Sequence, residues 1–268
     1  MTYCIAIKVD RGLVFAADTR TSAGVDDVRT YNKLHSFQFP GERVFVLMSA
    51  GNLATTQAVL AAIKRDLQAE NDGPSIRTLS SMYEVAEYVG TLSKRAQKQV
   101  DASEGSATVE TTLILGGQIA GEEPQVYLIY PLGNYITVSP ESPFLQIGEH
   151  KYGKPILDRI IRQQTTLEDA ARCALVSLDS TMRSNLSVGP PLDLAVVPTD
   201  ALDITHRMRL DTDTPYYAEL KESWARNLES IFSKLPRFDW EAGRAPGTGH
   251  PDDGAEAGGA SASVLRLR

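Results

Sequence analysis

Residues 2–24 read TYCIAIKVDRGLVFAADTRTSAG, and this stretch decides the fold. Two apolar runs within it, residues 2–9 and 13–18, are typical of neighbouring β-strands. The Asp10–Gly12 segment between them predicts a three-residue hairpin loop with the glycine in the left-handed conformation. We therefore expect the chain to begin with a tight β-hairpin.

A three-residue loop fixes which residues of this hairpin face each other. Residue i then lies opposite residue 22 − i, so Thr2 faces Arg20 and Asp18 faces Cys4. Side chains alternate with a period of two, so these four residues share one face of the hairpin. The pattern predicts the Asp18 carboxylate one diagonal step from the Thr2 hydroxyl, a relation that a two-residue loop would reverse.

The rest of the chain alternates strand-like and helix-like segments. Short apolar runs predict further strands at residues 35–39, 43–49, 111–119, 125–130 and 192–198. Apolar residues at helical spacing predict helices at residues 52–69, 80–99, 152–162, 167–183 and 214–234. This order indicates an α+β protein with two antiparallel sheets and helices layered outside them.

The composition is that of one globular domain followed by a tail. The chain has 268 residues, and we assign residues 2–240 to the domain. After Trp240 the sequence is rich in Gly, Ala, Ser, Asp and Pro, which predicts a disordered tail over residues 241–268.

Charge and cysteine content exclude several classes of partner. The net charge of −7 argues against nucleic acid or an anionic membrane as the main partner, because both require basic surfaces. Apolar runs are too short to span a bilayer, and the N-terminus lacks the order of a secretory signal. Cys4 and Cys173 support neither a disulfide framework nor a zinc site, so we expect a cytoplasmic protein without metal or cofactor.

Thr2 is a candidate nucleophile if Met1 is removed. The hydroxyl of threonine is weak by itself and needs a base. A free α-amino group on the same residue, with a pKa of roughly 7.7–8.0, could take the hydroxyl proton. The small size of Thr2 favours removal of Met1.

Three other residues could complete such a site. Lys33 near the N-terminal amine would disfavour its cationic form, and Asp18 would hold the ammonium of Lys33 in place. The Ser49–Asn52 turn joins a strand to a helix, so the Gly51 amide could stabilise an oxyanion. Each feature alone also has an ordinary explanation. Thr2 could simply be a strand residue and Asp18 a strand end, Lys33 could be a solvated lysine, and the Ser49–Asn52 turn could be an ordinary helix cap.

Taken together, these motifs resemble those of proteasome β-type subunits and their bacterial relatives. Thr2 is followed by GLVFAADTRTSAG, then Lys33, then LMSAGNLA, in the order and spacing of that family. The absence of a propeptide before MTYCIAIK, the stretch NLSVGPPLDLAVV and the extended C-terminal region are similar to the bacterial ancestral β-subunit family called Anbu. The resemblance covers roughly residues 2–235.

This resemblance implies an N-terminal-nucleophile hydrolase fold, a four-layer αββα sandwich. It implies Thr2 as nucleophile and base, Asp18 and Lys33 as residues that tune the amine, and Gly51 as an oxyanion donor. It also implies a peptide or protein substrate and self-assembly into a ring or an open spiral of identical subunits.

Two positions depart from the family pattern. Proteasome subunits carry Asp-x-x-Ser before a glycine turn; here Ser187 aligns with the serine, but Ser184 stands where the aspartate is expected. Gly148-Glu149 replaces the usual Gly-Ser pair, and Glu149 could restore a charge nearby. We therefore keep three hypotheses: a threonine peptidase, an amidase acting on a small or unusual amide, and a ring-forming scaffold with little or no activity.

Overall fold

The computed structural model describes residues 1–22, 28–69, 73–101, 109–238 and 240–241. Its internal contacts divide the chain into two units, Met1–Arg226 and Asn227–Arg268. The first unit contains both large sheets and four complete helices, and the boundary falls within the last helix. The predicted tail at residues 241–268 lies almost wholly outside the described residues.

The first five-stranded sheet is built around the N-terminal hairpin. Its strand order is β10-β1-β2-β11-β12, and all of its neighbouring strands are antiparallel. The strands are β1 (Tyr3–Val9), β2 (Gly12–Asp18), β10 (Phe144–Gly148), β11 (Leu192–Pro198) and β12 (His206–Leu210).

The second five-stranded sheet is an antiparallel meander with the order β5-β6-β7-β8-β9. Its strands are β5 (Leu34–Phe39), β6 (Arg43–Gly51), β7 (Thr111–Ile119), β8 (Gln125–Ile129) and β9 (Tyr135–Thr137). A separate two-stranded ribbon pairs β3 (Arg20–Ser22) with β4 (Val28–Thr30).

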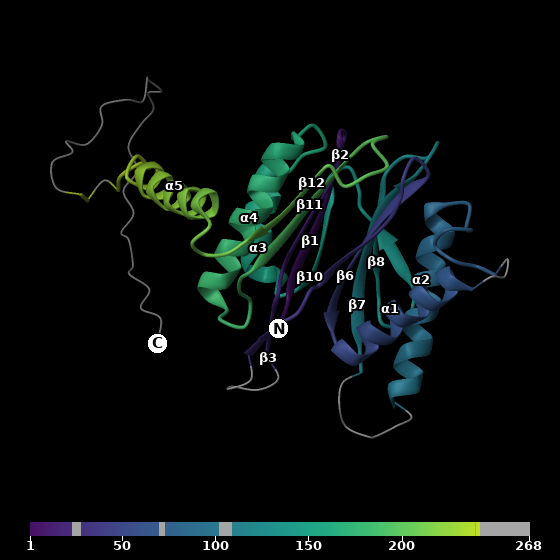
Figure 1. Ribbon diagram of the computed structural model, residues 1–268. Helices are drawn as coiled ribbons and strands as arrows, with labels where there is room; N and C mark the ends of the chain where they lie inside the picture. Colours follow the sequence, from purple (N-terminus) through teal and green to yellow (C-terminus); the bar gives the residue numbers. More distant parts are fainter. Residues whose placement is uncertain (23–27, 70–72, 102–108, 239, 242–268) are drawn as a thin grey trace, which may run out of the picture. The chain divides into compact units, whose positions relative to one another are not determined.

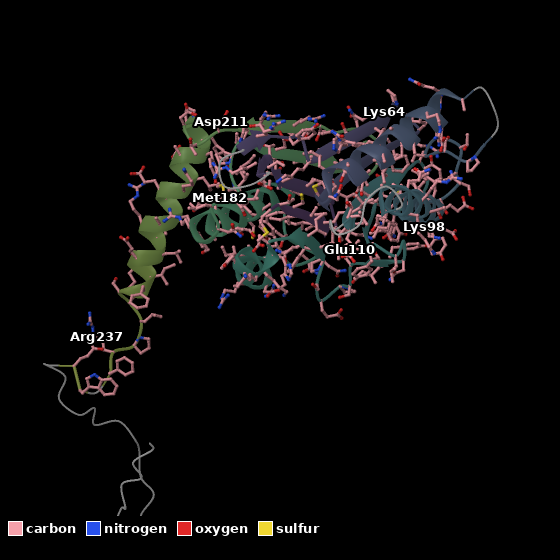
Figure 2. All side chains as sticks on the ribbon, turned by 90° about the horizontal axis from the view of Figure 1, so that it is seen from below. Lys64, Lys98, Glu110, Met182, Asp211 and Arg237 are labelled. Atoms are coloured by element: carbon pink, nitrogen blue, oxygen red, sulfur yellow. The ribbon has the colours of Figure 1, made fainter. Side chains whose placement is uncertain are left out.

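Helices cover the outer face of each sheet. These helices are α1 (Leu53–Gln68), α2 (Met82–Asp101), α3 (His150–Ile160) and α4 (Leu167–Ser184). A further helix, α5 (Pro215–Phe232), crosses the boundary between the two units. Figure 1 shows α3 and α4 against the first sheet, with α1 and α2 on the far side of the second. In Figure 2, Met182 of α4 lies across the sheets from Lys64 of α1 and Lys98 of α2.

Three separate apolar cores hold these layers together. One core lies between the first sheet and α3/α4 and contains Tyr3 and Leu178. A second lies between the two sheets and contains Phe15 and Met48. The third packs the second sheet against α1 and α2. Three cores require four layers, so the predicted αββα sandwich is confirmed.

The predicted three-residue hairpin loop is wrong. Val9 pairs with Gly12 and Cys4 with Ala17, so only Asp10 and Arg11 form the loop. Gly12 has a φ of 140°, and an added Cβ there would collide with the carbonyl oxygen of Val197. The glycine therefore serves a close approach of strands inside the sheet, not a left-handed loop position.

This register shift changes the partners expected at the N-terminus. Cys4 faces Ala17 instead of Asp18, and Arg20 pairs with Thr30 in the small ribbon instead of facing Thr2. Asp18 is the last residue of β2, and its carboxylate is held by the Tyr3 amide inside the hairpin and by Gly189 and Lys33 outside it. The predicted proximity of the residues therefore needs a different structural explanation, given below.

Most predicted elements are present, but five short strands were not predicted. They are β3, β4, β9, β10 and β12, of three or five residues each. Four residues of β12 are exposed and three of its five are basic or His, so this edge strand lacks an apolar signal. Among the residues described, no helix combines the length and apolar character needed to cross a membrane.

Candidate active site

The two sheets meet at an ion pair between Asp18 and Lys33. Asp18 ends β2 of the first sheet, and Lys33 immediately precedes β5 of the second. Lys33 Nζ lies 2.7 Å from Asp18 Oδ1, and the side chains are 7% and 0% exposed. A charged pair this deeply buried is costly to desolvate, so its retention marks the place as a candidate site.

Two backbone amides fix the Asp18 carboxylate. Tyr3 N donates to Oδ1 at 2.9 Å, and Gly189 N donates to Oδ2 at 3.2 Å. Burial raises the pKa of Asp18, while Lys33 and the two amides act in the opposite direction. These donors stabilise the carboxylate at the end of β2 and aim it at the lysine.

The Lys33 ammonium is held between the ion pair and the start of the chain. It donates to the carbonyl oxygen of Arg20 at 2.6 Å and to that of Met1 at 3.3 Å. The Met1 carbonyl carbon is bonded to the nitrogen of Thr2, so the ammonium lies beside the bond whose cleavage would free the Thr2 amine. The structure thus brings together Thr2, Asp18 and Lys33.

The N-terminal backbone is anchored on its other side by α3. The amide of Glu149 donates to the carbonyl oxygen of Thr2 at 2.7 Å. An added Cβ at Gly148, where φ is 82°, would collide with the same oxygen. The Gly148-Glu149 pair therefore lets the start of α3 approach the N-terminus, and sequence reasoning had not assigned this backbone role.

Electrostatics at the N-terminus favour a neutral amine. Desolvation lowers the pKa of the Met1 amine from its ordinary value of 8.0, and Lys33 lowers it further. Asp18 and Glu149 oppose this shift. A less cationic amine at this place is better suited to accept a proton near neutral pH.

Gly51 is the last residue of β6, at the junction with α1. Its φ is 119°, and an added Cβ would collide with the carbonyl oxygen of Glu110. The next residue, Asn52, caps α1 by accepting a hydrogen bond from Thr55 N at 3.1 Å. The Gly51 amide thus lies at the start of α1, where helix geometry favours negative charge.

The N-terminus, Lys33 and Gly51 line a cleft of about 320 Å³. Its walls combine the N-terminus with residues from β3, β6, β10, α1 and the segment between β4 and β5: Met1, Thr2, Thr21, Tyr31, Asn32, Lys33, Ser49, Ala50, Gly51, Leu53, Thr56 and Gly148. Tyr31 and Asn32 were not predicted as site residues, and no motif marks them. Within the described ranges, no group of three or more His, Cys, Asp or Glu residues could hold a metal ion.

The two predicted serines occupy different positions relative to this cleft. Ser184 is the exposed last residue of α4. Ser187 is half-buried, and its Oγ donates to Asn185 Oδ1 at 2.5 Å. The Ser187 hydroxyl therefore stabilises the turn after α4, and neither serine is among the residues that line the cleft.

Arg20 clamps this turn against the ion pair. Its Nη1 donates to the carbonyl oxygen of Leu186 at 2.7 Å, and an added Cβ at Gly189 would strike its guanidinium. Gly189 in turn donates to Asp18. Arg20 thus supports Asp18 through its side chain and Lys33 through its carbonyl oxygen.

Comparisons with known proteins agree with this geometry. A family model described as proteasome subunit matches residues 2–197. An Anbu (ancestral beta-subunit) protein from Yersinia bercovieri is 42% identical, with a TM-score of 0.84 over 89% of this chain and 99% of that chain. An Anbu (Gly-1) mutant from Hyphomicrobium sp. strain MC1 is 48% identical, with a TM-score of 0.84 over 89% and 100% of the two chains.

Two further proteins extend the comparison. An Anbu complex from Pseudomonas aeruginosa, described as a helical assembly, is 42% identical with a TM-score of 0.84, over 90% of this chain and 99% of that chain. The proteasome subunit beta of Haloferax volcanii is 23% identical over 219 residues, which cover 78% of this chain and 79% of that protein. Because the family model covers residues 2–197 and the Anbu structures cover 89–90% of this chain, the chain belongs to the proteasome subunit family, with the N-terminal-nucleophile hydrolase fold of its Anbu (ancestral β-subunit) members.

Proposed function

We propose that this chain is a threonine-type peptidase that hydrolyses peptide bonds with Thr2 after Met1 is removed. The observation that carries the proposal is the buried Lys33–Asp18 pair, whose ammonium also reaches the Met1 carbonyl oxygen at 3.3 Å. A cation held at this point lowers the pKa of an adjacent amine and so favours its basic form.

In the first half of the reaction, the Thr2 amine accepts the proton of the Thr2 hydroxyl. The oxygen attacks the substrate carbonyl carbon, and the tetrahedral intermediate collapses with cleavage of the C–N bond. The leaving amine takes the proton from the Thr2 ammonium. In the second half, water attacks the carbonyl carbon of the ester on Thr2 while the Thr2 amine accepts a proton from the water. The C–O bond to Thr2 then breaks, the carboxylic acid product leaves, and the Thr2 oxygen takes the proton back from the Thr2 ammonium.

The remaining residues support this chemistry. The Gly51 amide, at the rim of the cleft, would donate to the developing oxyanion. Asp18 keeps the Lys33 ammonium in place, and Arg20 holds both through the contacts described above. Ser187 and the exposed Ser184 would act only through the shape of the turn after α4, and Glu149 through its backbone amide.

We also propose that copies of this chain assemble into a ring or an open spiral. The proposal draws on the Pseudomonas aeruginosa Anbu complex described as a helical assembly, which covers 90% of this chain. Heterologous interfaces produce rings when the rotation closes and helices when it does not. Light scattering after gel filtration would give the molar mass, and a monomer at micromolar concentration would contradict assembly.

Intact-mass analysis and covalent labelling test the catalytic proposal together. We expect purified protein to lack Met1 and a peptide vinyl sulfone to add one equivalent to Thr2. The Thr2→Ala variant should show no addition. A retained Met1, or an unlabelled Thr2 in folded protein, would contradict the proposal and favour a scaffold role.

Substrate tests separate the peptidase from the amidase. Cleavage of an unfolded protein such as casein, lost in Thr2→Ala, would support the peptidase. Turnover of a small amide with no cleavage of casein or peptides, also lost in Thr2→Ala, would favour the amidase.

A further inference from the structure

The side chain of Tyr3 ties the residue next to Thr2 into the protein core. Tyr3 is fully buried between the first sheet and α3/α4. Its hydroxyl lies 2.7 Å from Ser177 Oγ on α4 and also receives a hydrogen bond from Gln146 of β10. An apolar residue would fill the same space, so the hydroxyl and its two polar partners require an explanation beyond packing.

The absence of a side chain at Gly153 leaves room for this hydroxyl. An added Cβ at Gly153 of α3 would collide with the Tyr3 hydroxyl and with Ser177 Oγ. Strand β1, helix α3 and helix α4 therefore meet around one buried oxygen atom. Three elements adapted to a single hydroxyl indicate that its position matters.

Both ends of Tyr3 are fixed, and Thr2 is attached to one of them. The Tyr3 amide donates to Asp18 Oδ1 at 2.9 Å, and the hydroxyl is held by Ser177 and Gln146 at the far end of the side chain. A terminal residue has no preceding chain to hold it and tends to fray. Catalytic groups must stay within roughly 0.5 Å of their productive position.

We infer that Tyr3 is a positioning residue whose hydroxyl, through Ser177 and Gln146, holds the Thr2 hydroxyl and amine in register with Lys33. The inference rests on the proposed function, because it assigns Tyr3 a part in the reactivity of Thr2. It also makes a claim about anchoring that can be measured without any reaction.

The kinetic experiment compares Tyr3→Phe with a matched variant, Tyr217→Phe. Tyr217 is likewise fully buried in the same core, but among the residues described its hydroxyl has no hydrogen-bond partner. For labelling by a peptide vinyl sulfone, we expect Tyr3→Phe to lower the maximal rate constant about tenfold, with apparent affinity changed less than about twofold. Tyr217→Phe should label like the unchanged protein.

Hydrogen exchange supplies a readout that is independent of activity. The backbone amide of residue 3 should exchange at least about tenfold faster in Tyr3→Phe than in the wild-type protein, because the N-terminus opens locally. In Tyr217→Phe it should exchange at the wild-type rate. If the wild-type protein is not labelled, the proposed function fails, and faster exchange in Tyr3→Phe still supports the anchoring role of the Tyr3 hydroxyl. An exchange rate in Tyr3→Phe equal to that of the wild-type protein would overturn the anchoring role.

A second variant covers the case in which Tyr3→Phe does not fold. Ser177→Ala removes one partner of the hydroxyl and leaves the tyrosine ring in place. We expect slower labelling and faster exchange in the same direction, at about threefold. A labelling rate that falls only in proportion to the fraction of folded protein would overturn the inference. A labelling rate equal to that of the wild-type protein in both Tyr3→Phe and Ser177→Ala would also overturn it.

Discussion

At the scale of single residues, the site depends on a charged pair that neither sheet could hold alone. Asp18 comes from the first sheet and Lys33 from the start of the second, and both side chains are almost completely buried. Removing one member leaves the other charge buried without compensation, whereas removing both leaves no such charge. This asymmetry separates the structural cost of the pair from its proposed catalytic role.

Lys33→Met should lower the free energy of unfolding by about 3–5 kcal/mol, because Asp18 loses its partner in a buried site. Adding Asp18→Asn should restore much of that stability, since the buried charge is then gone. Urea denaturation of both variants measures the effect. Vinyl sulfone labelling should remain at least about 10²-fold slower in both, and recovery of labelling in the double variant would contradict the role of the pair.

The reaction should also show a pH dependence set by the N-terminal amine. Desolvation and Lys33 lower the pKa of the Met1 amine below 8.0, and we expect the Thr2 amine to share this environment after Met1 is removed. Only the neutral amine accepts a proton, so kcat/KM should rise with pH and level off above an inflection below 8.0. A pH–rate profile with its inflection clearly above 8.0 would contradict this assignment.

At the scale of secondary-structure elements, the junction between β6 and α1 decides where the amide of Gly51, the proposed oxyanion donor, lies. Gly51 still pairs with Thr111 of β7, yet the next residue already caps α1. The backbone turns within one residue, with a φ of 119° that residues with a side chain rarely adopt. Glycine is therefore needed at this junction for two reasons: the backbone has a positive φ, and β7 approaches too closely to leave room for a side chain.

Gly51→Ala should destabilise the protein by about 2–3 kcal/mol, because strain at positive φ adds to a collision with the Glu110 carbonyl oxygen. Gly121→Ala is the matched control: its φ is 84°, and nothing lies within 4 Å of the added Cβ. This control should cost only about 1 kcal/mol. Chemical denaturation measures the free energy of unfolding of both variants. Equal losses in Gly51→Ala and Gly121→Ala would show that the close approach of β7 does not contribute.

At the scale of the whole molecule, the site exists because two sheets pack face to face at a fixed distance. Phe15 of the first sheet points into the core between the sheets, where its ring lies over Gly116 of the second. An added Cβ at Gly116 would come within 2.5 Å of the ring. The packing that fixes the sheet separation also fixes the separation of Lys33 and Asp18.

Gly116→Ala should therefore cost about 1–3 kcal/mol in the free energy of unfolding, because the added methyl group overfills the core. Combining it with Phe15→Leu, which removes ring atoms at the contact, should cost less than the sum of the two single changes. By urea denaturation, the loss of unfolding free energy in the double variant should be smaller than the sum of the two single losses by at least about 0.5 kcal/mol. Additive effects would contradict a direct contact.

The sequence predicted the element order well where periodicity was strong. Residues 111–119 and 192–198 form the predicted strands, and helices were found within a few residues of their predicted ends. Short edge strands were missed because β9 and β12 have few buried residues. Amide donors such as Gly189 N were also missed, because backbone groups leave no mark on residue type.

The sequence by itself determined the layered architecture, the family likeness, and the choice of Thr2, Asp18 and Lys33 as candidates. These follow from local periodicity and from residue types at particular spacings, which are present in the linear chain. The tertiary structure alone decided the hairpin register, the 2.7 Å distance between Lys33 and Asp18, and the hydrogen bond from the Gly189 amide to Asp18. Those features depend on how two sheets and α4 pack, and packing joins residues whose separation along the chain carries no signal.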